Sequence, residues 1–163
     1  MPLIVGTLQS ELIAAIDKGP SGNPSGTLVG LDIAKAYMNF CSTGMNAGAG
    51  SFTAMPGASA LGQDLGNILG GSSPASALTA QKIATEVDKC LQTFLSVFQN
   101  TIVTTAGLPL LTGELVQVFS SPAPSATLFA QSFASALNNY TLAAIVIGVI
   151  PGTPPVPFTG PIS

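Results

Sequence analysis

Charged side chains are too scarce in this chain to cover its surface. Only 7% of the 163 residues are charged, and the cations are four lysines, with no arginine and no histidine. An ordinary soluble domain has roughly 25% charged residues, and a dispersed monomer of this size needs such a coat. We therefore expect a membrane or other protein subunits to cover much of this surface.

A membrane is the weaker of these two explanations. The longest apolar run, Leu142 to Ile150, has nine residues, whereas a membrane-spanning helix needs about 20. Polar residues such as Asn138 and Asn139 precede the run, and no Lys or Arg flanks it to set an orientation. Burial against protein is the better explanation, and a membrane-associated or pore-forming protein that uses residues 127–150 remains the alternative.

The composition also excludes several classes of chemistry. Four scattered lysines and a net charge of −3 give no basic patch for nucleic acid. Without histidine, Ser–His and Cys–His nucleophile systems are excluded, and no glycine-rich loop ends in Lys-Ser or Lys-Thr to hold phosphate. We predict no catalytic residue, no cofactor and no small-molecule substrate, and therefore no enzyme.

Paired carboxylates are the one catalytic arrangement that the composition leaves open. Most of the acids lie on predicted helices beside lysine, which is typical of a solvated face. Glu86 and Asp88 are two residues apart and do not share a helical face. The seven acids are Glu11, Asp17, Asp32, Asp64, Glu86, Asp88 and Glu114.

Cys41 and Cys90 both lie in apolar helical patterns, and we interpret them as buried free thiols. Whether they pair in a disulfide is not readable from the sequence. Two thiols without histidine give no closed ligand set, so no metal site is predicted. The N-terminal residues have neither a basic region nor a long apolar region, and we expect a protein made in the cytosol rather than exported through a secretory signal.

Four segments have hydrophobic residues at helical spacing and are predicted to be helices. The strongest covers about 75–100, with Lys82, Glu86 and Lys89 opposite an apolar stripe, and Lys82 with Glu86 as an i,i+4 pair. The other three helices cover about 7–18, 25–42 and 125–139. The predicted inner faces include Leu28, Leu31, Val97 and Leu128.

A weaker helical segment, about 58–69, contains Gly62 and Gly66. Their four-residue spacing resembles the small-xxx-small pattern of close helix packing, but simple glycine richness is the favoured explanation. Glycine inside a helix costs about 1 kcal/mol relative to alanine, which weakens the prediction of a helix here.

The C-terminal half is expected to contain one or two short strands. Residues 101–105 and 141–150 are rich in β-branched residues and are predicted to be strands, while 108–119 fits either a strand or a short helix. Five prolines in 151–163 predict an extended arm that docks on a neighbour and cannot lie centrally in a sheet.

These elements predict a mainly α fold, with α+β as the alternative. About four helices pack together with long irregular loops, in a single helical domain over residues 1–150 that is followed by the Pro-rich arm 151–163.

Three predicted helix starts resemble each other at a spacing of fifty residues. They are Pro24-Ser25-Gly26-Thr27-Leu28, Pro74-Ala75-Ser76-Ala77-Leu78 and Pro124-Ser125-Ala126-Thr127-Leu128. Duplication of a helix–loop unit would produce this register, and so would chance, because proline is favoured in the first helical turn and alanine is common here. Both interpretations stay open.

The charge deficit is greatest toward the C-terminus, where Glu114 is the only charged residue from Cys90 onward. We therefore predict that the interface between subunits lies in this region. The interface candidates are Tyr140, Ile145, Ile147, Pro154, Pro155, Pro157, Phe158 and Ile162.

In the general character of its sequence, the whole chain resembles the small Ala/Gly/Ser/Thr-rich virion proteins of tailed bacteriophages. The resemblance rests on Ser-Gly-Thr-type helix entries, on the loop Asn46-Ala47-Gly48-Ala49-Gly50 and on the tail Pro157-Phe158-Thr159-Gly160-Pro161. It implies a non-enzymatic virion structural subunit of the tail, baseplate or neck, assembled in the host cytoplasm as a homo-oligomer. Its partners would be copies of itself and other virion proteins. A cell-surface or filament subunit and an enzyme are more distant alternatives.

Overall fold

The computed structural model describes residues 3–17, 25–71, 75–121 and 125–163. Six helices and five short strands occur in these residues, so the sequence-based expectation of about four helices is too low, while the mainly helical character with strands in the C-terminal half is confirmed. The helices are α1 (Val5–Ile16), α2 (Gly26–Ser42), α3 (Ala58–Gly70), α4 (Ser76–Gln92), α5 (Gly107–Ser120) and α6 (Ala126–Ala143). The strands are β1 (Phe52–Ala54), β2 (Leu95–Ser96), β3 (Asn100–Val103), β4 (Ile145–Ile150) and β5 (Val156–Pro161).

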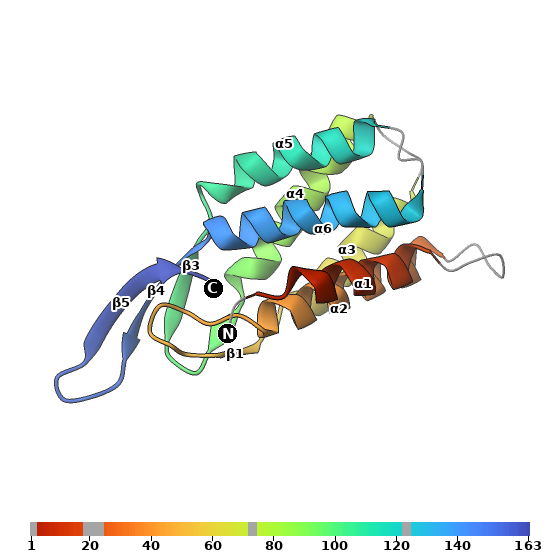
Figure 1. Ribbon diagram of the computed structural model, residues 1–163. Coiled ribbons are helices and arrows are strands. Elements are labelled where there is room, and N and C mark those ends of the chain that lie inside the picture. Colours follow the sequence, from red (N-terminus) through yellow and green to blue (C-terminus); the bar gives the residue numbers. More distant parts are fainter. Residues whose placement is uncertain (1–2, 18–24, 72–74, 122–124) are drawn as a thin grey trace.

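The six helices form a closed bundle with three inner and three outer members. α2, α4 and α6 are the inner helices, and each outer helix packs against two of them: α3 against α2 and α4, α5 against α4 and α6, and α1 against α6 and α2. The strands lie together at one end of the bundle, near both ends of the chain (Figure 1). We call this end the strand end, comprising residues 43–57, 93–106 and 144–163.

The bundle is built from three equivalent helical hairpins, which we call repeat 1 (α1–α2), repeat 2 (α3–α4) and repeat 3 (α5–α6). The inner helices begin at Gly26, Ser76 and Ala126, which are fifty residues apart. The buried residues of the three inner helices are also related by this fifty-residue spacing. The matching buried residues are Ile33, Ile83 and Phe133, then Ala34, Ala84 and Ala134, then Phe40, Cys90 and Tyr140.

The fifty-residue spacing in the sequence therefore corresponds to a repeat of structure. Pro24, Pro74 and Pro124, which introduce the matching segments, lie outside the described residues.

The outer helices repeat as well, in a pattern that the sequence analysis missed. Each carries Leu-x-x-Glu/Asp-Leu with both leucines fully or almost fully buried. The three segments are Leu8–Leu12, Leu61–Leu65 and Leu111–Leu115, with Glu11, Asp64 and Glu114 as their acids. The first two are separated by 53 residues and the last two by 50, because the connection in repeat 1 is longer. A search at a fixed spacing of fifty residues therefore relates the three inner helices but leaves out the outer helix of repeat 1.

Glycine allows α2 and α3 to approach closely. A Cβ on Gly30 would collide with the backbone nitrogen of Gly66 and lie 2.5 Å from the carbonyl oxygen of Gly62. A Cβ on Gly66 would lie 2.8 Å from the Cα of Thr27. Gly62 and Gly66 are therefore a true close-packing pair, and glycine richness alone does not explain them. The residues that match Gly30 in the other repeats are alanines, Ala80 and Ala130.

Several predicted helix boundaries and faces are wrong. The helix predicted over 75–100 ends at Gln92, where the Thr93 hydroxyl donates to the Cys90 carbonyl, and Asn100 donates from its side chain to the Phe94 carbonyl in the loop that follows. The ambiguous segment 108–119 belongs to α5, and the first part of 141–150 belongs to α6. Glu86 forms its ion pair with Lys89, at 2.8 Å, rather than with Lys82. The predicted inner-face residues that are exposed are Leu28, Leu31, Val97 and Leu128.

The C-terminal residues belong to the domain rather than to a separate arm. β5 pairs antiparallel with β4, which pairs with β3, so two of the five prolines, Pro157 and Pro161, lie in an edge strand of a three-stranded sheet. Ile162 is fully buried, and Ser163 exchanges two backbone hydrogen bonds with Met45. The segment is extended, as its prolines predict, but it docks on its own chain.

Candidate functional site

The strand end contains no charged residue. All eleven Lys, Asp and Glu side chains fall outside residues 43–57, 93–106 and 144–163. Large apolar side chains are nevertheless exposed there, among them Leu95, Val97 and Val156 at 50%, 55% and 54%. An uncharged surface with exposed apolar side chains is typical of the centre of a protein interface.

The clearest part of this surface is the outer face of the β3–β4–β5 sheet. Ile147 and Val149 of β4 are 46% and 42% exposed and lie on the same side of the strand. Directly opposite Ile147 are Thr101 of β3 and Thr159 of β5, and Val149 pairs with Pro157. Since paired residues share a face of a sheet, these side chains form one uncharged patch, which we call the sheet face.

The β5 edge of this sheet is closed to further strands. The Val149 amide donates to the Gln99 carbonyl, so odd-numbered residues of β4 direct their backbone groups toward β3 and even-numbered ones toward β5. In β5, Pro157 and Pro161 pair with odd-numbered β4 residues, so their nitrogens face away from β4. Two of the outward positions thus lack an N–H, which opposes strand addition. Contact with a partner is therefore favoured on the face and not on this edge.

The interface residues predicted from the sequence fall into two groups. Ile147, Pro154, Pro155 and Pro157 are exposed at the strand end, and Ile145 and Phe158 are partly buried there. Tyr140 and Ile162 are fully buried inside the chain, so neither side chain is accessible to a partner, and for these two the prediction is wrong. The local sequence around these two residues does not distinguish a core position from a surface position.

Buried polar side chains join the inner helices near the strand end. The Tyr140 hydroxyl donates to Asp88 Oδ1 at 2.7 Å, and Gln92 Nε2 donates to Asp88 Oδ2 at 2.8 Å. On the other side, the Tyr37 hydroxyl and Thr141 Oγ1 lie 2.9 Å apart. Burial raises the pKa of Tyr140, and its hydrogen bond to Asp88 raises that pKa further. The network thus satisfies a buried carboxylate and links α2, α4 and α6, which is a structural role.

The two cysteines lie near this network as buried free thiols, as predicted from the sequence. Burial raises the pKa of the Cys90 thiol to about 12 and raises that of Cys41 further. The thiolate is the reactive form of cysteine, so both thiols are protonated and unreactive at neutral pH.

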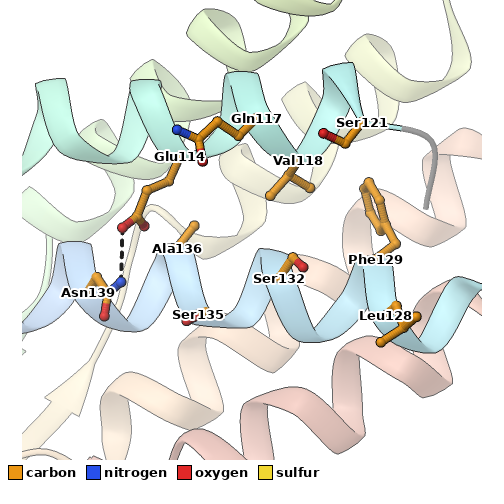
Figure 2. A pocket seen from close by; sticks show the side chains of 10 residues that line it. All are labelled: Glu114, Gln117, Val118, Ser121, Leu128, Phe129, Ser132, Ser135, Ala136 and Asn139. Carbon is orange, nitrogen blue, oxygen red and sulfur yellow. Dashed lines mark hydrogen bonds between the residues drawn. The ribbon is translucent and has the colours of Figure 1, made fainter. Parts of the chain in front are cut away.

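A groove of about 480 Å³ runs between α5 and α6 (Figure 2). Glu114 points across it from α5 and accepts a hydrogen bond from Asn139 Nδ2 of α6 at 3.0 Å. The second carboxylate oxygen, Oε2, is buried and has no hydrogen-bond partner among the described residues. The rest of the lining is uncharged: Gln117, Val118, Ser121, Leu128, Phe129, Ser132, Ser135 and Ala136.

Repeat 1 contains the matching groove, between α1 and α2. There Asn39 Nδ2 donates to both oxygens of Glu11, at 3.2 and 3.0 Å. This groove is smaller, about 270 Å³, and it is also lined by Asp32 and Lys35. An acid on the outer helix that faces an amide on the inner helix is therefore a repeated feature, visible in the sequence only after the outer helices are aligned.

Three of the acids considered in the sequence analysis lie in different surroundings. Asp88 is buried in the polar network, Glu86 pairs with Lys89, and Asp64 lies on α3. Among the described residues, no three Cys, Asp or Glu side chains are placed to hold a metal ion. Within that same part of the chain, no helix is long and apolar enough to cross a membrane.

No protein-family model, curated protein or solved structure matches this chain.

Proposed function

We propose that this chain is a non-enzymatic structural subunit of a tailed-bacteriophage virion, in the tail, baseplate or neck. It acts by packing against copies of itself and against other virion proteins, after assembly in the host cytoplasm. The virion assignment rests on the resemblance of the sequence to small phage structural proteins. The packing role rests on the surface of the strand end.

The observation that carries the packing role is the uncharged strand end with its exposed sheet face. Covering an exposed Ile or Val side chain is worth about 1.5–3 kcal/mol when burial is complete. Ile147 and Val149 remain 46% and 42% exposed in the isolated chain, so part of that free energy is still available for association. No charged side chain at this end has to be desolvated when a partner docks.

The opposite end of the bundle offers a second set of apolar contacts. Leu28, Leu78 and Leu128 occupy matching positions near the starts of the three inner helices and are 57%, 44% and 47% exposed. A subunit with apolar side chains at both ends of a charged bundle is suited to stacking between neighbours along its axis.

The surroundings of the strongly perturbed groups support a structural role. The strongly perturbed groups, Tyr37, Cys41, Cys90 and Tyr140, are buried in the core, and the causes of their raised pKa values are dominated by burial. Catalytic groups are usually perturbed where a cleft exposes them to substrate.

The association state of the purified chain tests the packing role. Sedimentation velocity over a hundredfold range of concentration should show association that persists at about 0.5 M salt, because the contact is apolar. Mass spectrometry and electron microscopy of purified particles then test the virion assignment. A chain that stays monomeric at the highest concentration contradicts the packing role, and its absence from purified particles contradicts the virion assignment.

A further inference from the structure

The three repeats differ in how the acid of the outer helix is compensated. In repeat 1, Lys35 lines the same groove as Glu11. In repeat 2, hydrogen bonding to Glu86 raises the pKa of Lys89, and the nearby charge of Asp64 contributes to the same shift. Each of these acids therefore has a lysine of its own chain nearby.

Repeat 3 has lost both lysine positions. Ser135 stands where repeat 1 has Lys35, and Asn139 stands where repeat 2 has Lys89. The groove is also larger, about 480 Å³ against about 270 Å³ in repeat 1, consistent with serine in place of the longer side chain. Glu114 is the only charged residue of α5 and α6, and its buried Oε2 lacks a donor within the described chain.

We propose that the α5–α6 groove binds a lysine side chain of a neighbouring copy of this chain, which places its ammonium group on Glu114. The inference rests on the proposed function for the source of the side chain. The ammonium group brings a positive charge to the groove of Glu114, as Lys35 brings one to the groove of Glu11. A charge-assisted hydrogen bond to a partly buried carboxylate is stronger than one between neutral groups.

The walls of the groove suit the remainder of such a side chain. Val118 lies one helical turn from Glu114 on α5, and Ala136 lies one turn from Asn139 on α6, so apolar surface flanks the carboxylate (Figure 2). The methylene groups of a lysine pack on such surface while its ammonium group reaches a polar partner. Ser132 and Ser135 add hydroxyl groups along the same groove.

Two substitutions isolate the role of the carboxylate. Glu114→Gln keeps the side-chain length and still accepts from Asn139, but it removes the charge. Glu11→Gln makes the same change in repeat 1, where Lys35 is already present, and serves as the matched control. Ser135→Lys restores the lysine of repeat 1 in repeat 3 and should occupy the groove from within. The melting temperature of each variant verifies that it is folded.

Saturation-transfer NMR with n-butylammonium chloride, a lysine side-chain analogue, measures binding whatever the association state. We expect saturable binding to the parent chain, at least tenfold weaker binding to the Glu114→Gln and Ser135→Lys variants, and no change for Glu11→Gln. n-Butanol, which has the same hydrocarbon but no charge, should not bind saturably. Equal binding to the parent and to Glu114→Gln, or equal loss in Glu11→Gln, would overturn the site.

The source of the cationic group is tested separately, by sedimentation velocity of the same variants. If a neighbouring subunit supplies it, Glu114→Gln and Ser135→Lys should weaken association at least threefold, and Glu11→Gln should not. Variants that lose n-butylammonium binding but associate like the parent would assign the groove to a free amine and overturn the subunit source. If the parent itself does not associate, the proposed function fails, while the amine-binding result stands on its own.

Discussion

The helical bundle and the strand end of this molecule differ in where their charged and apolar side chains lie. The bundle carries every charged side chain of the described residues apart from Asp17, which caps α1, and buries matching positions three times over. The strand end carries no charged side chain, and its exposed sheet face is formed by β3, β4 and β5, which precede and follow repeat 3. The bundle therefore accounts for the stability of the fold, and the strand end presents the surface left for partners. Substitutions in the bundle should therefore change mainly the free energy of unfolding. Substitutions on the sheet face should instead weaken association and leave the free energy of unfolding almost unchanged.

The largest effect on stability is expected from Gly30→Ala. The new methyl group would meet the backbone of Gly62 and Gly66, so α2 and α3 must separate. We expect a loss of about 3 kcal/mol or more, or failure to fold, because overpacking against backbone is not relieved by a rotamer change. Urea unfolding measures the free energy.

Gly113→Ala is the matched control for this substitution. Gly113 also lies inside a helix, α5, but no atom would lie within 4 Å of its Cβ. This variant should gain roughly 0.5–1 kcal/mol from helix propensity. Equal effects of the two substitutions would show that close packing of α2 on α3 is not what requires glycine at position 30.

Removing the Tyr140 hydroxyl should have the next largest effect. Tyr140→Phe leaves Oδ1 of the buried Asp88 without its donor, and a hydrogen bond to a charged group contributes about 1.5–3 kcal/mol. Tyr37→Phe removes a bond between neutral groups, and Thr141 keeps its bond to the Leu137 carbonyl, so about 0.5–1.5 kcal/mol is expected. Thermal and urea unfolding of both variants should preserve this order, and the reverse order would contradict the role assigned to Asp88.

Alkaline pH should destabilise the bundle through its buried thiols and hydroxyls. Burial raises the pKa of Cys90 to about 12 in the folded chain, whereas an exposed thiol titrates near 8.5. Above that lower pKa the unfolded chain releases a proton that the folded chain retains, so stability is complete below about pH 8.5 and is lost as pH rises toward 12.

The slope of this loss is about 1.4 kcal/mol per pH unit for each such group. Cys90→Ser removes one titrating thiol, so the free energy of unfolding of this variant should fall less steeply with pH, whatever the effect of the substitution at neutral pH. Urea unfolding from pH 7 to 11 gives both slopes, and identical slopes would mean that Cys90 is not held protonated by the fold.

Substitutions at the helix caps should change the free energy of unfolding by a smaller amount, and the effect should differ between the repeats. Ser25 and Ser125 accept hydrogen bonds from the amides of Leu28 and Leu128, whereas Ala75 provides no side-chain cap to α4. Ser125→Ala should cost about 1 kcal/mol, and Ala75→Ser should gain a comparable amount. Unfolding measurements that show no gain for Ala75→Ser would mean that the three inner helices do not start equivalently.

The sequence predicts the periodic parts of this fold and misses what depends on contacts. Helical spacing located the inner helices to within a few residues except at the end of α4, where Thr93 and Asn100 end the helix through side-chain hydrogen bonds. The segment 108–119 was ambiguous because apolar residues alone fit a strand or a helix, and Leu111 and Leu115 become informative only beside Leu61 and Leu65.

The candidate site was predictable only in part. The missing charge indicated the C-terminal region, and Ile147 and Pro157 do lie on the exposed sheet face. Burial of Tyr140 and Ile162 depends on tertiary contacts that no local pattern contains, namely Asp88 for the first and the pairing of Ser163 with Met45 for the second. The pairing of Glu114 with Asn139 likewise joins helices whose alignment the sequence did not reveal.

The most direct test of the account is the association of a chain with a charged sheet face. Ile147→Lys with Val149→Lys places two charges on exposed positions, so the free energy of unfolding should change by less than about 1 kcal/mol. Gln63→Lys with Asn67→Lys adds the same charge to exposed positions of α3 and is the control. In sedimentation velocity the account predicts that the sheet-face variant becomes monomeric while the parent and the control associate. A sheet-face variant that remains folded and associates like the parent would contradict it.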